Sequence, residues 1–364
     1  MSKNLDNIFK HNQYTLSSNK KNEIFIEVLK NDFKRHYNNS LETRNILDSL
    51  EYDENKINDL NEFPFFPIRL FKELKLKSVK DEKIIKTLTS SGTTGQKVSK
   101  IFLDSDTSKL QTKALASIVS SYIGGKRLPM IIIDSDSVIK DRKMFSARGA
   151  GILGLSNFGK DHFYLLDQEM KIKIDALFDF LSTHQHQPLL LFGFTFIVWL
   201  HFIQELDKRN ITINIPDSFL IHSGGWKKLE SIAVDNITFK SKIEKLTGLK
   251  KVFNFYGMVE QVGSIYMECE SGFFHASNFS EIIIRDGKTL EPLGYDKKGV
   301  IQTISLLPKS YPGNSILTED EGIIIGKDTC KCRRKGTYFN VIGRTPAAEL
   351  RGCSDTYAVS IDVK

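Results

Sequence analysis

The residues whose types and spacing most clearly suggest a binding site form one short run at 89–97, Thr-Ser-Ser-Gly-Thr-Thr-Gly-Gln-Lys. Its glycines tolerate positive φ and let backbone N–H groups converge, while the hydroxyls add donors and the lysine adds positive charge. Such a loop suits a polyphosphate. The residues expected to bind it are Ser90, Ser91, Gly92, Thr93, Thr94, Gly95 and Lys97.

The surroundings of this loop narrow its class. Runs of β-forming residues at 83–88 and 98–103 flank it, which predicts a strand, a loop and a second strand. A P-loop nucleotidase needs G-x-x-x-x-G-K-[ST] before a helix, a Rossmann site needs G-x-G-x-x-G, and neither spacing occurs here. An ordinary polar hairpin turn remains the alternative, because Gly, Ser and Thr also crowd such turns.

The loop resembles the phosphate-binding signature of the adenylate-forming superfamily, which includes acyl- and aryl-CoA ligases, luciferases and nonribosomal adenylation domains. Residues 65–72 (Phe-Phe-Pro-Ile-Arg-Leu-Phe-Lys) and 223–228 (Ser-Gly-Gly-Trp-Lys-Lys) resemble the acyl-protein synthetases of the LuxE type, which activate fatty acids in bacterial bioluminescence systems. The resemblance implies that ATP and Mg²⁺ activate a carboxylic acid, expected to be fatty, as acyl-AMP. Transfer to a thiol then follows.

Two segments follow expected strands, and ligands of α/β sheets bind beyond the carboxyl ends of strands. Gly224, Gly225 and Trp226 follow the strand at 219–221, and the resemblance places this glycine pair in the adenine pocket. The alternative is a plain strand-to-helix turn in which Trp226 caps the core.

The second segment is Tyr256-Gly257-Met258-Val259-Glu260, which is similar to the superfamily's Tyr-Gly-x-Thr-Glu with Val259 in place of Thr. By resemblance Tyr256 stacks on adenine beside Gly257, and Glu260 helps to hold Mg²⁺. A hard carboxylate is chemically apt for that ion. The change to Val259 removes one hydroxyl near the phosphates and leaves the metal ligand in place.

Two further residues are assigned by resemblance. Asp320 stands where a Thr-x-Asp motif binds the ribose hydroxyls, and a solvated acidic turn is the alternative. Arg344 matches the Gly-Arg of the hinge. The superfamily continues into a lid domain with a catalytic lysine, but only 20 residues follow Arg344 and none matches that lysine. Charge neutralisation is therefore expected from Lys97, Mg²⁺ and Arg344.

The four cysteines have two interpretations. Cys269, Cys330, Cys332 and Cys353 could form a four-thiolate zinc site, although their spacing matches such sites poorly. Alternatively Cys353 is the acyl acceptor, as implied by LuxE-type enzymes, which use a cysteine of their own near the C-terminus. Arg351 beside it would favour the thiolate. An ordinary small buried residue is the plain alternative.

The order of expected elements predicts an α/β fold. It consists of an adenylate-forming-like N-terminal domain, with a helix-flanked mixed sheet and a β-rich subdomain, and an absent or very short lid. Residues 1–75 are expected to form a helical region, 76–310 the α/β core and 311–364 a β-rich segment. Helices are expected at 23–37, 107–122, 172–182, 194–207 and 240–246, and strands at 130–133, 189–192, 219–221, 252–255, 282–284, 300–307 and 323–325, with Asp-Gly, Pro-Gly and Glu-Gly turns between the last three.

Composition excludes several classes. The 364 residues have a net charge of +7 spread along the chain, which favours anionic ligands such as ATP or an acidic carrier protein. No nucleic-acid-binding motif accompanies that charge. No signal peptide is evident and the apolar run at 189–203 is too short to span a bilayer, so a cytoplasmic protein is expected. The aromatic run 192–202 is either core or the wall of an acyl pocket.

Other acceptors keep the fold: a CoA ligase or a loader of an acyl carrier protein, with an acyl reductase as a further partner. A nucleotide-binding scaffold without turnover is a different class. The sequence leaves the acid, the acceptor and the oligomeric state open.

Overall fold

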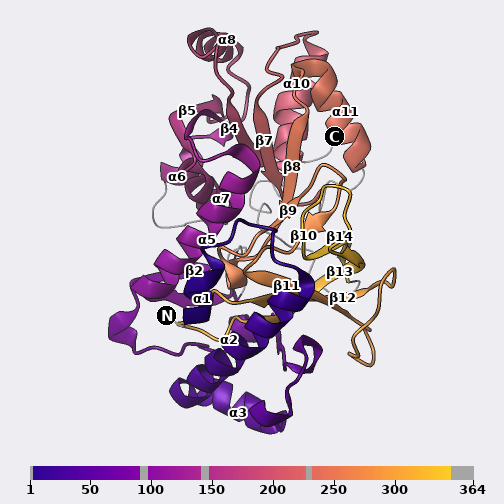
Figure 1. Ribbon diagram of the computed structural model, residues 1–364. Coiled ribbons are helices and arrows are strands. Elements are labelled where there is room, and N and C mark those ends of the chain that lie inside the picture. The colour runs from indigo at the N-terminus through magenta and orange to yellow at the C-terminus, as the bar shows by residue number, and fades with distance from the viewer. Residues whose placement is uncertain (1–2, 91–96, 141–146, 227–231, 346–364) are drawn as a thin grey trace. The chain divides into compact units, whose positions relative to one another are not determined.

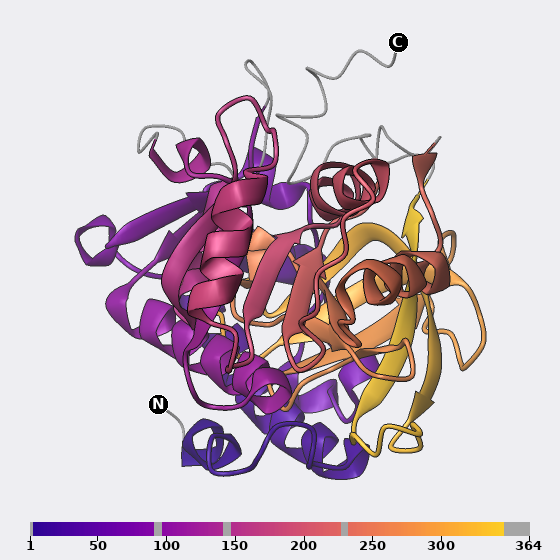
Figure 2. The same ribbon diagram turned by 90° about the horizontal axis from the view of Figure 1, so that it is seen from above.

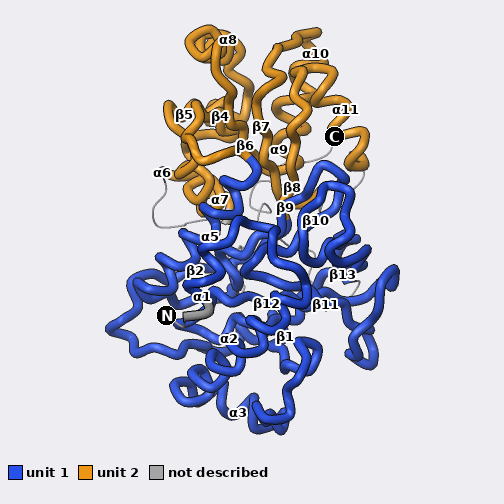
Figure 3. Tube along the Cα trace, viewed as in Figure 1, with its two compact units in different colours: residues 1–90, 96–122, 256–349 blue, residues 91–95, 123–255, 350–364 orange. Residues whose placement is uncertain are grey.

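The structure is a computed structural model that describes residues 3–90, 97–140, 147–226 and 232–345 (Figure 1). The chain divides into two compact units, coloured in Figure 3. Unit 1 comprises residues 1–90, 96–122 and 256–349, and unit 2 comprises residues 91–95, 123–255 and 350–364. Each unit is therefore assembled from separate segments of the sequence.

Unit 2 is built on a parallel sheet whose strands follow the order β8-β7-β6-β4-β5. The apolar runs of β4, β6 and β7 are buried on both faces, as expected for parallel strands covered by helices. The strands are β4 (Leu128–Ser135), β5 (Gly159–Leu166), β6 (Leu190–Phe194), β7 (Phe219–Ser223) and β8 (Lys251–Tyr256). The helices are α6 (Ser137–Lys140), α7 (Ala147–Ser156), α8 (Ile174–Thr183), α9 (Thr195–Ile197), the π-helix η4 (Val198–Ile203), α10 (Gln204–Lys208) and α11 (Asn236–Thr247).

Successive side chains of β6 point to opposite faces of this sheet, and each face meets a helix. Figure 2 shows the strands and helices from above. A Cβ on Gly193 would lie 2.8 Å from Val198 of η4, so that face meets the η4 helix. The neighbouring Phe194 points the other way, where its ring lies 3.4 Å from the Cβ position of Gly151 in α7. The chain adds β5 on one side of β4 and then β6 on the other. In sheets with this strand order, ligands bind beyond the carboxyl ends of the two strands where the order reverses, here β4 and β6.

Unit 1 is mainly antiparallel, with strand order β11-β12-β13-β14-β10-β9 and β1 paired parallel to β13. Its strands are β1 (Phe66–Pro67), β2 (Lys86–Thr89), β3 (Lys100–Leu103), β9 (Tyr266–Glu268), β10 (Phe274–His275), β11 (Ser280–Arg285), β12 (Gly299–Ser305), β13 (Ser315–Lys327) and β14 (Thr337–Arg344). Its α-helices are α1 (Lys3–Ile8), α2 (Ser18–Asn39), α3 (Leu41–Ser49), α4 (Leu70–Glu73) and α5 (Ser105–Ile123). Its 3₁₀ turns are η1 (Glu54–Lys56), η2 (Leu60–Glu62), η3 (Asp81–Lys83) and η6 (Val259–Gln261).

Helix α2 shows how the N-terminal region joins this unit. Ser17 caps the helix by accepting a hydrogen bond from the backbone of Lys20, and the apolar side of the helix is buried. Lys21 on that side is only 1% exposed. Its Nζ donates to the backbone oxygen of Ser280 at 2.8 Å and lies 3.1 Å from the carboxylate of Glu281. A buried charge is tolerated only with such partners, so this pair fixes α2 against β11.

The predicted α/β fold is confirmed, and the expected helices and strands are present. The predicted Glu-Gly turn before the strand at 323–325 is wrong. Glu321 and Gly322 lie inside β13, at a bulge. A Cβ on Gly322 would stand 2.7 Å from the carbonyl oxygen of Asn340, so the glycine serves the close approach of two strands. Among the described helices, none is long and apolar enough to cross a bilayer.

Candidate functional site

The β2–β3 hairpin positions the hydroxyl-rich loop. The two strands pair antiparallel from Lys86 and Leu103 to Thr89 and Lys100, which confirms the two predicted strands that flank the loop. At the base of the loop the backbone N–H of Ser99 donates to Ser90 Oγ at 2.9 Å. Ser91, Gly92, Thr93, Thr94 and Gly95 lie outside the described residues. The structure therefore defines the two ends of this loop, and their phosphate-binding role stays a prediction.

Lys97 is the charged residue at the end of the loop. Its side chain is 70% exposed, and its Nζ lies 2.5 Å from the carboxylate of Glu73 in α4. Exposed ion pairs contribute at most about 1 kcal/mol, because water and salt screen them. The ammonium can therefore exchange Glu73 for a more highly charged anion at small free-energy cost.

Glu260 lies in η6 and is only 4% exposed. Burial raises the pKa of its carboxyl group, whereas the Ser99 side chain and the positive charges of Lys72 and Arg344 oppose that increase. The carboxylate thus lies within electrostatic reach of residues from three separate segments of the chain. An additional cation at this place would stabilise its charged form.

The backbone around Glu260 is held by a hydrogen-bond relay. Tyr311 Oη donates to the carbonyl oxygen of Glu260 at 2.9 Å, and Gln111 Nε2 donates to Tyr311 Oη at 3.2 Å. Gly263, with φ +86°, passes so close to α5 that a Cβ would stand 2.6 Å from the carbonyl oxygen of Gln111. A glycine is needed there, both for its conformation and for space.

Tyr256, Asp320 and Arg344 form a polar cluster in unit 1. Asp320 and Arg344 are paired in register between β13 and β14, with Arg344 Nε 3.8 Å from Asp320 Oδ1. Tyr256 Oη donates to Asp320 Oδ2 at 2.7 Å. Burial raises the pKa of Tyr256 well above its usual value, and the charge of Asp320 adds to this, so the phenol stays a neutral donor. Asp320 therefore lies in a strand and is held by partners, instead of in the solvated turn considered as its alternative.

Gly224, Gly225 and Trp226 follow β7 in unit 2. Gly224 has φ +84°, and a Cβ there would lie 3.3 Å from the ring of Phe194, whereas a Cβ on Gly225 would meet no atom within 4 Å. The ring of Trp226 meets that of Trp199 edge-on with centroids 6.0 Å apart. This packing supports the interpretation that Trp226 covers apolar core, and it leaves Gly225 as the residue with open space above its backbone.

The remaining predicted residues stand as follows. Gly257 is half-buried directly after β8. Cys353 lies outside the described residues, so its role as acyl acceptor stays a prediction. Cys269 and Cys330 are buried free thiols, and Cys332 is half-buried.

Sequence reasoning missed three residues that support Glu260: Lys72, Ser99 and Tyr311. Lys72 ends the motif at 65–72, and that motif indicates a family resemblance without assigning a role to the lysine. Its charge acts on a carboxylate 188 positions away in sequence, a proximity that no local pattern encodes. Tyr311 carried no signal, because a buried tyrosine in a β-rich segment reads as ordinary core.

Comparison with solved structures identifies the fold. An open conformation of 2-hydroxyisobutyryl-CoA ligase, in complex with 2-HIB-AMP and CoA, superimposes with a TM-score of 0.69 at 14% identity and covers 91% of this chain and 76% of that chain. At this identity the similarity shows the fold alone. The chain has the fold of the adenylate-forming ligases.

The family follows from the sequence comparisons. A family model described as acyl-protein synthetase, LuxE, matches residues 1–361, and the chain belongs to this family. The long-chain-fatty-acid–luciferin-component ligase of Aliivibrio fischeri is 26% identical over 340 residues, covering 88% of this chain and 84% of that protein. The protein of the same name from Vibrio harveyi is 21% identical over 359 residues, covering 94% and 89%. As a member of this family the chain is an ATP-dependent, AMP-forming acid–thiol ligase that activates a carboxylic acid as acyl-AMP.

Proposed function

We propose that this ligase activates a long-chain fatty acid and passes the acyl group to its own Cys353. Both curated relatives carry long-chain fatty acid in their names. Unit 2 supplies a suitable wall, because the aromatic run 192–202 is buried around η4, including Phe192, Phe196 and Phe202. A long acyl chain needs apolar surroundings of this kind. The proposal includes a cytoplasmic location, because the reaction consumes ATP.

The proposed ATP site rests on the cluster of Tyr256, Asp320 and Arg344. The positive charge of Arg344 also acts on the carboxyl group of Glu260 and opposes the increase in its pKa. We assign Asp320 to the ribose hydroxyls, because a partly exposed carboxylate is a strong hydrogen-bond acceptor. Tyr256 offers its ring to adenine. Arg344 then lies on the phosphate side, together with Lys97 and the hydroxyl-rich loop.

Glu260 fits Mg²⁺. Its carboxyl group is a hard oxygen ligand whose pKa is raised by burial, and the Ser99 side chain lies beside it. Proteins bind Mg²⁺ through one or two carboxylates together with substrate phosphates. When bound, the ion would neutralise charge on the phosphates.

The reaction requires the chain to stabilise two successive charge movements. The carboxylate oxygen of the acid forms a bond to the α-phosphorus of ATP, and the bond to the β-phosphate oxygen breaks, so pyrophosphate leaves. We assign to Lys97, Arg344 and the donors of the loop the stabilisation of the negative charge on the leaving group. In the second step the Cys353 thiolate forms a thioester with the acyl carbon, and AMP leaves with the electrons of the broken bond.

The decisive experiment separates the two steps. The protein is incubated with ATP, Mg²⁺ and single fatty acids of increasing length, and pyrophosphate exchange and intact mass are measured in parallel. We expect acid-dependent exchange, and a mass increase equal to one acyl group that hydroxylamine removes. Cys353→Ser should keep exchange and lose the acyl adduct, whereas the neighbouring control Ser354→Ala should keep both.

Two results would contradict the proposal. An acyl adduct that persists in Cys353→Ser would place the acceptor at another residue, and acyl transfer only to added CoA or carrier protein would favour those acceptors. Absence of exchange with every acid tested would favour a nucleotide-binding scaffold without turnover.

A further inference from the structure

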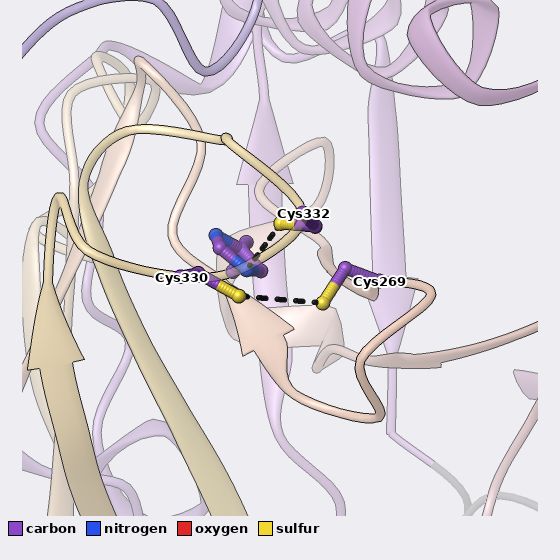
Figure 4. A group of neighbouring side chains, drawn as sticks. Cys269, Cys330 and Cys332 are labelled. Atoms are coloured by element: carbon purple, nitrogen blue, oxygen red, sulfur yellow. Dashed lines mark hydrogen bonds between the residues drawn. The ribbon is translucent and has the colours of Figure 1, made fainter.

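Four side chains that could bind a metal ion lie close together in unit 1, away from the nucleotide cluster formed by Tyr256, Asp320 and Arg344. One ligand atom from each of Cys269, His275, Cys330 and Cys332 lies within 4.8 Å of the other three. Figure 4 shows the sulfur atoms of Cys269, Cys330 and Cys332 close together, with Cys330 and Cys332 on one loop and Cys269 on another. His275 is fully buried, and Cys269 and Cys330 are buried as well.

Two β-hairpins bring these residues together. Cys269 directly follows β9 and His275 ends β10, with a turn at Gly272 (φ +82°) between them. Cys330 and Cys332 lie in the loop that joins β13 to β14. Because β10 pairs antiparallel with β14, the ends of the two hairpins are held side by side by the sheet itself. The four ligands are thus positioned by backbone hydrogen bonds, and not only by contacts among themselves.

Two of the six distances between ligand atoms match those of a tetrahedral zinc centre, and all six are at most 4.8 Å. Cys269 Sγ and Cys330 Sγ are 3.8 Å apart, and Cys332 Sγ is 3.4 Å from His275 Nε2. With Zn–S near 2.3 Å and Zn–N near 2.05 Å, tetrahedral angles require edges of about 3.8 Å between sulfurs and about 3.5 Å between sulfur and nitrogen. A disulfide would need the sulfurs about 2.0 Å apart. The cluster is therefore spaced for a shared ion and not for a cross-link.

The surroundings favour a closed structural site. The ring of Tyr338 stacks on that of His275 with centroids 5.6 Å apart, and Phe273 packs against the buried thiols. Arg334 pairs with both carboxylate oxygens of Glu270 next to the cluster. Cys269 and Cys330 are thus shielded from solvent, whereas Cys332 at the edge of the ligand set is half-buried.

We propose that Cys269, His275, Cys330 and Cys332 bind one Zn²⁺ ion. Each thiol loses its proton to the solvent as its sulfur bonds to the metal, and the imidazole binds in its neutral form. Three thiolates and one imidazole are a donor set that zinc uses in structural sites. His275 takes the place that the four-thiolate interpretation of the sequence gave to Cys353.

The role of this ion is structural. Four protein ligands leave no position open for substrate. Asp320 and Lys327 are seven residues apart on β13, about 23 Å at 3.3 Å per residue, so the metal end of the hairpin lies far from the nucleotide cluster. The ion instead fastens the β9–β10 hairpin to the loop between β13 and β14. This inference does not depend on the proposed acyl transfer.

The test measures metal directly. Protein purified after expression with Zn²⁺ in the medium should contain about one zinc per chain by plasma mass spectrometry. Replacement of the metal by Co²⁺ should give an intense tetrahedral visible spectrum with thiolate charge-transfer bands. Cys269→Ser and Cys330→Ser should lose most of the metal. Cys353→Ser is the matched control and should retain it.

Conservative exchanges keep the test decisive if a serine variant does not fold. His275→Cys and Cys332→His keep four zinc ligands and should retain the metal, whereas His275→Phe should lose it. The proposal is overturned if the wild-type protein stays metal-free after dialysis against one equivalent of Zn²⁺. Full zinc occupancy in Cys269→Ser and Cys330→Ser, loss of zinc in Cys353→Ser, or an intact mass two hydrogens lower with Cys269 linked to Cys330 would also overturn it. None of these readouts requires enzymatic activity.

Discussion

The residues that we assign to ligand binding differ in kind between the two units. Unit 2 presents bare backbone after β7, where Gly225 has open space beside it, and otherwise buries apolar strands between helices. Unit 1 presents charge: Lys97, Glu260, Asp320 and Arg344 all belong to it, on strands and turns from distant parts of the sequence. The charged candidate residues thus belong to the mainly antiparallel unit, which joins segments that are far apart in sequence. The candidate residue of the parallel unit is a glycine that leaves space beside the backbone. Substitutions in the two units should differ accordingly.

The largest effects are expected from the charges of unit 1. Lys97→Ala and Glu260→Gln should each lower acid-dependent pyrophosphate exchange by about a hundredfold or more, because each removes preorganised charge stabilisation. Lys34→Ala is a matched control, since Lys34 is a similarly exposed lysine of unit 1 paired with Glu54. It should leave exchange unchanged. Wild-type rates in both site variants would remove these residues from the reaction.

Acid should destabilise both units through a buried histidine in each. Burial lowers the pKa of His36 in unit 1 and of His222 in unit 2 to about 3. The unfolded chain binds these protons near pH 6.5, so stability is full above that pH and falls as pH decreases toward 3. At pH 5 the loss is about 2 kcal/mol per histidine.

Urea unfolding at pH 7.5 and pH 5 checks this expectation. His36→Gln and His222→Gln should each reduce the difference between the two midpoints. The exposed His186 is the control, and His186→Gln should not change it. Equal acid sensitivity in all variants would show that the buried histidines do not control the response.

A smaller effect is expected from the phenol of unit 1. Tyr256→Phe removes the hydrogen bond to Asp320 and keeps the ring, so ATP affinity should fall by about tenfold or less, as for loss of one charge-assisted hydrogen bond. Asp320→Ala should weaken ATP further. Tyr37 donates to Asp48 at 2.9 Å in the helical part of the same unit, and Tyr37→Phe is the matched control. Calorimetry that gives one affinity for all of these proteins would contradict the ribose and adenine assignment.

The smallest effects belong to the glycines of unit 2, and they separate packing from ligand approach. Gly224→Ala should lower the free energy of unfolding by about 1 to 2 kcal/mol, because its φ of +84° disfavours a Cβ. Gly225→Ala should fold normally, since a Cβ there meets nothing, and should weaken ATP binding several-fold if adenine lies against it. Thermal melts and titration together decide. Unaltered affinity in Gly225→Ala would leave only the structural turn.

Local pattern was sufficient where neighbours in sequence are neighbours in space. The buried strand around Met130–Ile133, the β2–β3 hairpin and helix α2 follow from periodicity and turn residues, and the structure contains them. Long-range pairing was not accessible in this way. Cys269 and Cys330 are 61 residues apart and meet through the β10–β14 pairing, so the histidine of that group had no local signal.

The Glu321-Gly322 turn shows the opposite failure, in which a local signal was present and misled. A glycine there predicts a turn, yet it serves close packing between β13 and β14. Tyr256 and Asp320, 64 residues apart, were both named from motifs, but only the fold shows that they bond to each other. Motifs identify individual residues, and pairing of strands determines which of them act together.

The ion pair between Lys21 and Glu281 has a consequence for the order of events on the ribosome. Helix α2 is synthesised 260 residues before Glu281 (281 minus 21), an interval on the order of 10 to 50 s at typical rates of translation. During that time Lys21 has neither the carbonyl oxygen of Ser280 nor the carboxylate of Glu281 as a partner. The segment 123–255 emerges meanwhile and contains all the strands of its own parallel sheet. The parallel sheet of unit 2 can therefore form before Lys21 of α2 meets its buried partner on β11.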